Sequence, residues 1–316
     1  MSVLPPRGLI GALVTPLNNE YYIDKPSLKS LLDYTIKDLH GVLIGAADIG
    51  EGFALSNQKR IELIKTSMEI VNGRIPLFLN ITGDTEDHTA ENIIHVGRIK
   101  EDFNYKGDIF LLDCPLWYHS NKNLADLYIK FGKITTLPFI LYNNPHLITE
   151  LQEHLKRNNI RTNVLKKLSR NEQIVGIIHI GELKRAINYA KAVRDRRHFR
   201  IYDGNELNFL GNPSLDGVVA KGANILPKQW RTITESSINL KETIKDDPTY
   251  YTDLWKAGQM LKILHEAYLP NPTAIIKSAL KLMGTIGSRA VAEDTPSITP
   301  DQESRIYNLL AEYELI

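Results

Sequence analysis

Short apolar runs alternate with amphipathic stretches over the first 228 residues of the chain. The apolar runs are almost continuously hydrophobic, which is typical of strands buried on both faces of a parallel sheet. Amphipathic stretches separate most of them, so the pattern predicts strands and helices in alternation. The predicted strands cover residues 9–16, 41–46, 75–82, 108–115, 138–145, 174–180, 199–204 and 217–224.

The stretches between these runs have the spacing of amphipathic helices. The segment 26–39 places Leu28, Leu31 and Leu32 on one face, and the segment 57–71 follows Ser56, a residue that caps helix N-termini well. Similar patterns occupy 88–99, 123–131 and 182–193. Eight strands, most of them followed by a helix, predict a (β/α)8 TIM barrel. A doubly wound open sheet is the alternative, and the absence of G-x-G-x-x-G after the first strand makes it the weaker one.

The strand pattern stops near residue 228, and helical patterns follow at 249–269, 273–284 and 301–315. We therefore expect two units: a barrel at 1–228 and a C-terminal helical lobe at 229–316 that packs on it. The segment 147–171, between the fifth and sixth strands, holds two charged helical patterns where one would suffice. We interpret 151–159 as an inserted surface helix.

Composition narrows the classes of function. A 316-residue chain that is 43% hydrophobic can bury a large core, and its net charge of +1 gives no reason to expect nucleic acid or a membrane surface as partner. The single cysteine, Cys114, excludes an internal disulfide. The start of the chain lacks a signal-peptide pattern, and no apolar run is long enough to span a membrane. A soluble, cytoplasmic protein is predicted.

No motif for a metal or an organic cofactor is found. H-E-x-x-H, the P-loop and G-x-S-x-G are absent, and no metal ligands stand at a recognised spacing. We therefore expect no metal site and no cofactor, and a small molecule as substrate or ligand.

In a barrel the reactive groups lie at the C-terminal ends of the strands. Cys114 has no histidine placed beside it by sequence and is expected to be a buried thiol. The polar residues after the seventh strand are expected to cap the following helix. The strand ends carry Thr15, Asp48 with Glu51, Asn80 with Thr82, Asp113 with Cys114, Tyr142 with Asn143, His179, Asp203 with Asn205 and Glu206, and Lys221 with Asn224.

Five short motifs occur in one order along the chain: V-T-P-L at 14–17, G-E-G-F-A-L-S at 50–56, Y-N-N-P at 142–145, I-V-G-I at 174–177 and G-A-N-I-L-P at 222–227. Together they resemble the dihydrodipicolinate synthase/N-acetylneuraminate lyase family of class I aldolases. The resemblance implies a (β/α)8 barrel, a homo-oligomer (dimer or tetramer), and a lysine on the sixth strand that forms a Schiff base with pyruvate or another 2-oxo acid.

The matched positions depart from the family pattern where the chemistry is done. The Schiff-base lysine position holds Ile178, which cannot form an imine. Gly50 and Glu51 match the end of the family's G-T-T-G-E carboxylate loop, but its threonine positions hold Asp48 and Ile49. An anionic Asp48 would repel a carboxylate unless it is protonated or paired.

Two further family features are replaced. The family arginine that follows the Y-N-x-P proline is absent, because Pro145 is followed by His146 and Leu147. The paired tyrosines after the fourth strand become Leu116 and Trp117, with Tyr118 next to them. His179 neighbours Ile178, but strand alternation turns it the other way, so we expect a hydrogen-bonded structural histidine.

Two residues still allow imine chemistry in spite of these departures. Tyr142 matches the family's proton-relay tyrosine. A phenol at a strand end can fill this role because it can donate and accept a proton. Lys221 stands in the eighth strand, near Val219, on the side that faces the pocket, and burial there would lower the pKa of its amine.

Three readings follow. In the first, Lys221 replaces the family lysine in a rearranged lyase, with Tyr142 as relay. In the second, the protein is a catalytically inactive homologue in which Lys221 pairs with Asp48. In the third, it is a small-molecule-binding protein with Asp48 as the anchor. The residues matched to the family's substrate contacts are Asp48, Ile49, Gly50, Glu51, Ile178 and Val219.

Overall fold

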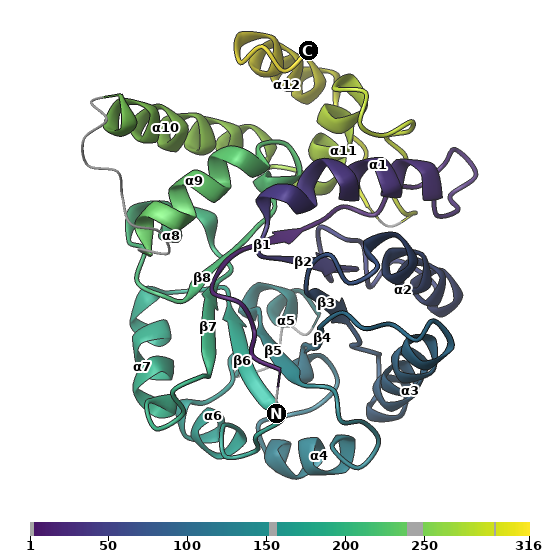
Figure 1. Cartoon of the computed structure of the whole chain (residues 1–316), viewed down its shortest axis with the longest axis vertical. Coiled ribbons are helices and arrows are strands. Elements are labelled where there is room, and N and C mark those ends of the chain that lie inside the picture. The colour runs from purple at the N-terminus through teal and green to yellow at the C-terminus, as the bar shows by residue number, and fades with distance from the viewer. Residues whose placement is uncertain (1–2, 152–156, 239–248, 294) are drawn as a thin grey trace.

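The computed structural model describes residues 3–151, 157–238, 249–293 and 295–316. Eight parallel strands close into a barrel in chain order, each hydrogen-bonded to the next and the eighth to the first. Figure 1 shows the ring of strands with helices around its outside. The strands are β1 Gly8–Ala12, β2 Gly41–Ile44, β3 Leu77–Asn80, β4 Ile109–Asp113, β5 Phe139–Asn143, β6 Ile174–His179, β7 Arg200–Asp203 and β8 Gly217–Ala220.

The predicted (β/α)8 TIM barrel is therefore confirmed, and the open sheet is excluded by the pairing of β8 with β1. All eight predicted strands are present in the predicted order, although most are shorter. The first ends at Ala12 rather than at residue 16, because Leu13 to Pro16 leave the sheet as a loop. The near-continuous apolar sequence of the strands reflects burial on both faces of the sheet. The side chains of Ile10, Phe78 and Phe110, for example, are fully buried.

Helices follow the strands, and most of them cover the outer face of the barrel. They are α1 Lys25–Thr35, α2 Asn57–Val71, α3 Glu86–Asp102, α4 Leu124–Phe131, α5 Pro145–Leu151, α6 Thr162–Leu168, α7 Leu183–Val193 and α8 Glu206–Gly211, with 3-10 turns at Ile36–Asp38, Pro115–Trp117 and Gly222–Asn224. The Ser56 side chain caps α2 as expected, accepting a hydrogen bond from the Lys59 amide.

A group of C-terminal helices follows β8: α9 Pro227–Ser237, α10 Tyr250–Tyr268, α11 Pro272–Leu282 and α12 Pro300–Glu312. They lie together beside α1 and α8 at one side of the barrel (Figure 1). The predicted C-terminal helical lobe is present. The dividing line at residue 228 stays a prediction.

The segment between β5 and β6 corrects one expectation. Two helices occupy it: α6 lies within the predicted charged stretch, whereas α5 ends at Leu151, where the predicted surface helix was to begin. The predicted helix at 151–159 is wrong at Arg157–Asn159, which is not helical; residues 152–156 lie outside the described part of the chain. The Asn143 side chain instead binds Asn159 and Ile160: it donates to the Asn159 side chain at 2.9 Å and accepts from the Ile160 amide at 2.8 Å.

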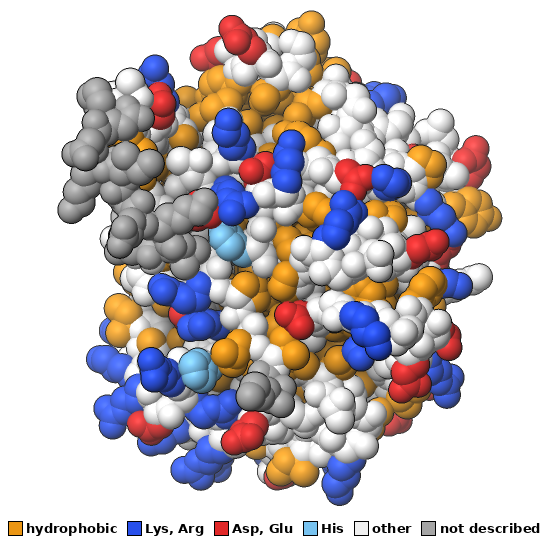
Figure 2. All heavy atoms as spheres, viewed as in Figure 1, with side chains coloured by type: hydrophobic (Ala, Val, Ile, Leu, Met, Phe, Trp, Pro, Cys, Tyr) orange, Lys and Arg blue, Asp and Glu red, His pale blue; other side chains and the backbone are white. Residues whose placement is uncertain are grey.

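The view in Figure 2 shows acidic and basic side chains interspersed over most of one face, with basic side chains gathered where Figure 1 shows α6 and α7. Among the described helices, none is long and apolar enough to cross a membrane.

Candidate active site

A cavity of about 400 Å³ opens at the C-terminal ends of the strands, where a barrel carries its reactive groups. The segments after β2, β5, β6, β7 and β8 form part of its wall, including the first turns of α5 and α8. The C-terminal end of α10 and the start of α11 supply the rest. The wall is rich in ionisable and amide groups. Its polar members are Asp48, Asn144, His146, Asn205, Glu206, Lys221, His265 and Tyr268.

Lys221 and Asp48 form the central ion pair of this wall. The Lys221 amine donates to the Asp48 carboxylate at 2.7 Å, and about a quarter of each side chain is exposed. Lys221 immediately follows β8, whereas Asp48 lies in the loop after β2, so the pair spans the mouth between two strands that are not neighbours.

The ion pair reverses the expected titration of the lysine. Burial alone favours the neutral amine, but the negative charge of Asp48, with a smaller contribution from Glu206, outweighs it and raises the pKa of Lys221 above its ordinary value. Burial likewise opposes ionisation of Asp48, yet the Lys221 charge and hydrogen bond hold the pKa of this carboxyl below its ordinary value. The expectation of a lowered Lys221 pKa is wrong, because the charge and hydrogen bond of Asp48, together with the charge of Glu206, outweigh desolvation, which is the largest single effect.

The other residues of the loop after β2 turn away from the cavity. Ile49 and Gly50 are buried, and a side chain at Gly50 would meet the Ala46 amide at 2.5 Å, so the turn requires glycine. Glu51 has a left-handed backbone, with φ of 54°, and points into the protein. Its carboxylate forms a fully buried ion pair with Lys277 of α11 and accepts from the Ala292 amide at 2.5 Å.

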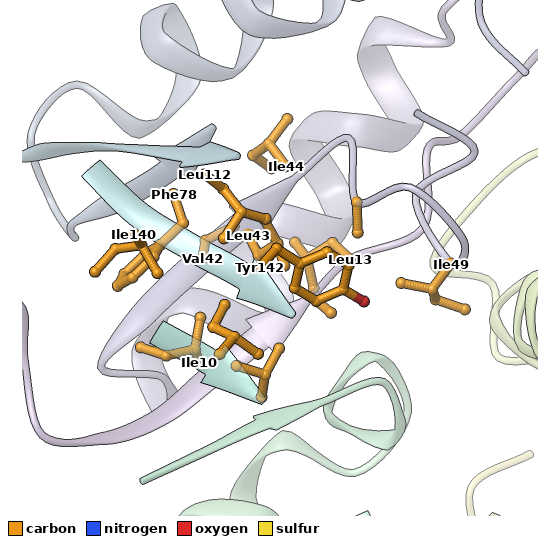
Figure 3. Packing of buried hydrophobic residues seen from close by; sticks show 14 of the residues in the cluster. Ile10, Leu13, Val42, Leu43, Ile44, Ile49, Phe78, Leu112, Ile140 and Tyr142 are labelled. Carbon is orange, nitrogen blue, oxygen red and sulfur yellow. The ribbon is translucent and has the colours of Figure 1, made fainter. Parts of the chain in front are cut away.

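Tyr142 lies deeper than the cavity wall. It is the penultimate residue of β5 and pairs with Ile178 of β6, and Figure 3 shows it within the apolar cluster that includes Leu13 and Ile10. Its hydroxyl accepts a hydrogen bond from the Asn144 amide at 3.4 Å, and Asn144 itself lines the cavity. Burial and the charge of Asp48 raise the pKa of the Tyr142 phenol well above its ordinary value, so it stays protonated.

Ile178 is fully buried, and Val219 is 6% exposed. Neither residue lines the cavity, and neither do Tyr142, Ile49, Gly50 or Glu51. Of the residues singled out from the sequence, the structure thus brings Lys221 and Asp48 together on the wall, with Tyr142 behind them. Direct contact of any of these residues with a ligand stays a prediction.

Two strand-end groups have structural surroundings. His179 is buried, its Nδ1 lies 3.1 Å from the Asn143 amide nitrogen and its ring packs edge-on against Tyr189. It faces the helix layer, as strand alternation predicts. Burial lowers the pKa of His179 to about 4, so it is neutral. Cys114 is a buried free thiol, as expected.

Tyr118 is bound to a buried carboxyl group at the end of β4. Its hydroxyl donates to Asp113 at 2.7 Å, as does that of Tyr128, and Thr82 adds a third hydrogen bond at 3.1 Å. Burial raises the pKa of Asp113 to about 6, against the lowering effect of these three donors.

Three cavity residues were not identified as functional from the sequence. Asn205 caps α8 as expected, accepting from the Asn208 amide, but the next residue, Glu206, faces the cavity. His265 and Tyr268 come from α10, far along the chain, and their spacing of three residues is the one signal that places them on a common helix face. Among the described residues, no group of histidine, cysteine and carboxylate side chains is arranged to hold a metal ion.

The fold and the position of the pocket place the protein in the class of (β/α)8 barrels that carry a polar pocket at the C-terminal ends of their strands. The model of the dihydrodipicolinate synthetase family matches residues 5–311, so the chain belongs to that family. Similar curated proteins are 4-hydroxy-tetrahydrodipicolinate synthases. The one from Trichlorobacter lovleyi is 26% identical over 98% of this chain and 99% of its own length, and that from Buchnera aphidicola subsp. Schizaphis graminum is 29% identical over 89% of each.

Solved structures support the same fold. Dihydrodipicolinate synthase from Thermotoga maritima matches with a TM-score of 0.79 at 19% identity, covering 99% of this chain and 100% of its own. YagE from E. coli K12, a family protein solved in complex with pyruvate, matches with a TM-score of 0.79 at 21% identity over 98% and 99%. At these identities the likeness shows the fold alone.

Proposed function

We propose that the protein is a dihydrodipicolinate synthase-like lyase that acts on a small 2-oxo acid through an imine on Lys221. The observation that carries the proposal is the Lys221 amine on the wall of the strand-end cavity, 2.7 Å from Asp48. Family membership supports aldolase-type chemistry, and the relatives named above are synthases of this class. Ile178 offers no amine, so the nucleophile has to come from another strand.

Asp48 gives the Lys221 amine a partner for each proton transfer of imine formation. The resting lysine is protonated, so its proton passes to Asp48 before the free amine attacks the keto carbon. The C–N bond forms as the carbonyl π electrons move to oxygen, and this oxygen takes a proton from the nitrogen to give a carbinolamine. The carbinolamine then loses its hydroxyl as water, and Asp48 returns the proton that this departure requires. Tyr142, protonated and linked to the wall through Asn144, is the proposed relay to that carboxylate.

Borohydride trapping tests this proposal. Incubation with pyruvate and borohydride is expected to add the mass of one reduced pyruvate to the protein, on the peptide that contains Lys221. Lys221→Met should abolish the adduct, whereas Lys228→Met, at an exposed position of α9, should leave it unchanged. An adduct that persists in Lys221→Met, or no adduct with pyruvate or longer 2-oxo acids, would contradict the proposal.

A second candidate function is a non-catalytic, ligand-binding homologue. The closed Lys221–Asp48 pair favours it, because the raised pKa of Lys221 keeps the amine charged and unreactive at rest. This function predicts a rise in melting temperature with a 2-oxo acid, an amine or a sugar, without any borohydride adduct, since a ligand that prefers the native state stabilises it.

A further inference from the structure

A second acid–base group lies on the cavity wall, centred on Glu206. Its side chain is buried, at 3% exposure. One carboxylate oxygen accepts from the Gly222 amide at 2.9 Å. The other accepts from the Tyr268 hydroxyl at 2.5 Å and lies 3.0 Å from Nδ1 of His265.

The fold places this group next to Lys221. Glu206 opens α8 after β7, and His265 and Tyr268 lie one turn apart on α10, with their rings edge-to-face at 5.1 Å. Gly222 is the residue after Lys221. A Cβ at Gly222 would stand 2.7 Å from the Trp230 indole nitrogen and 3.1 Å from the Tyr268 hydroxyl, so glycine permits the close approach.

Glu206 determines which histidine nitrogen is free. In the neutral form of the ring, a carboxylate beside Nδ1 favours the tautomer that carries the proton there, and the lone pair is then on Nε2. Within the described part of the chain, no side chain or backbone group bonds to Nε2 of His265, and the residue lines the cavity. His146, the other histidine on the wall, has no carboxylate partner among the described residues.

We propose that His265 is the catalytic base of this site, with Glu206 and Tyr268 as its positioning residues. This inference rests on the proposed function, because its substrate is the iminium formed between Lys221 and a 2-oxo acid. Nε2 of His265 takes a proton from C3, the carbon next to the imine carbon. The C3–H electron pair forms the C2=C3 bond, and the C=N electrons move to nitrogen, giving an enamine that is then ready to attack an aldehyde.

The neighbouring groups leave this role to His265. Asp48 is engaged with the Lys221 nitrogen, and the Tyr142 phenol holds its proton because its pKa is well above the ordinary value. A carboxylate–histidine pair is a common way to fix the tautomer and orientation of a general base. Proton removal by a positioned histidine contributes about 100-fold to 10,000-fold to such steps.

Exchange of the pyruvate methyl protons in D2O, followed by NMR, measures this step apart from imine formation. We expect exchange by the unaltered protein, and a rate at least about 100-fold lower for His265→Gln. Glu206→Gln should cause a similar loss, because an amide nitrogen that donates to Nδ1 puts the proton on Nε2. His198→Gln, an exposed position, serves as the control.

Borohydride trapping on the same samples separates the two proposals. Retained trapping with lost exchange in both variants supports His265 as the base, since a merely structural defect would lower both. Exchange that continues at the unaltered rate in His265→Gln and Glu206→Gln overturns this inference alone. So does trapping without exchange in the unaltered protein. A protein that neither traps pyruvate nor exchanges its protons overturns this inference together with the imine on Lys221.

Discussion

At the scale of single residues, the strand-end site is defined by one ion pair. Lys221 and Asp48 come from segments 173 positions apart and neutralise each other at the mouth of the barrel. The substitution that places Asp48 at a threonine position of the family loop would leave a carboxylate facing a carboxylate substrate. Lys221 compensates this charge, so the two residues are best understood as one unit.

Lys221→Met is expected to lower the free energy of unfolding at pH 7 by about 1–2 kcal/mol. The variant leaves Asp48 without its cation, and the loss is smaller than for a fully buried pair because both side chains are a quarter exposed. Urea denaturation followed by circular dichroism measures it. Asp48→Asn combined with Lys221→Met should recover most of the loss. A Lys221→Met protein as stable as the unaltered one would contradict the pairing.

The pair also predicts a pH window. Because the folded pKa of Asp48 is lowered, its stabilisation is present above the ordinary value of 3.8 and is lost as the pH falls through the folded value. Because that of Lys221 is raised, its contribution is present below 10.5 and is lost as the pH rises beyond the folded value. The stability difference between the unaltered protein and Lys221→Met should therefore be flat between these limits and shrink outside them.

Sequence alone identified this pair but missed Glu206 and His265. Lys221 and Asp48 stood out because each breaks a motif at a strand end. Glu206 occupies a position where helix caps are common, and its partner His265 follows 59 residues later in a helix of mixed polarity. Only the packing of α10 against α8 brings them together, and no local pattern encodes that contact.

At the scale of elements, the end of β4 is organised around a buried carboxyl group. Asp113 binds α4 through Tyr128 and the following 3-10 turn through Tyr118.

The prediction of strands and helices from the sequence was successful for the barrel because the buried strands are almost entirely apolar. The surface helix expected at 151–159 failed at Arg157–Asn159 because charged residues with helical spacing carry no apolar face to bury, and the Asn159 side chain bonds to Asn143 of β5 instead.

Asp113→Asn is expected to change how stability depends on pH. The folded pKa of about 6 lies above the ordinary 3.8, so the folded state holds this proton longer than the unfolded chain does. The unaltered protein therefore loses stability from this group as the pH rises from about 4 to 6, and the asparagine variant does not. Denaturation midpoints at pH 4, 5, 6 and 7 should show the stability of the variant, relative to the unaltered protein, rising and then levelling above pH 6. If the stabilities of the variant and of the unaltered protein changed in parallel with pH, a raised pKa of Asp113 would be refuted.

At the scale of the whole molecule, one buried ion pair joins the barrel to the C-terminal helices. Glu51 in the loop after β2 binds Lys277 in α11, which also donates to the Ala290 carbonyl at 2.7 Å. The left-handed backbone of Glu51 persists because these bonds hold its side chain. Sequence predicted both units and their order but not this connection. The homo-oligomer and the cytoplasmic location stay predictions.

Lys277→Met is expected to lower the free energy of unfolding by about 3–5 kcal/mol, because it leaves Glu51 buried without a cation. The double variant Glu51→Gln, Lys277→Met should regain a large part of this loss. Calorimetry checks both values and the number of transitions: the buried connection predicts that barrel and helices unfold together. Two separate transitions in the unaltered protein would contradict that view.

The Glu51–Lys277 pair has a consequence for how the site comes into existence during synthesis. The loop that holds Glu51 also carries Asp48, and its buried partner is made 226 residues later. A nascent chain that has finished all eight strands still has an unpaired Glu51 and lacks His265 and Tyr268. The pocket is thus expected to be completed only near the end of translation, after α11 leaves the ribosome.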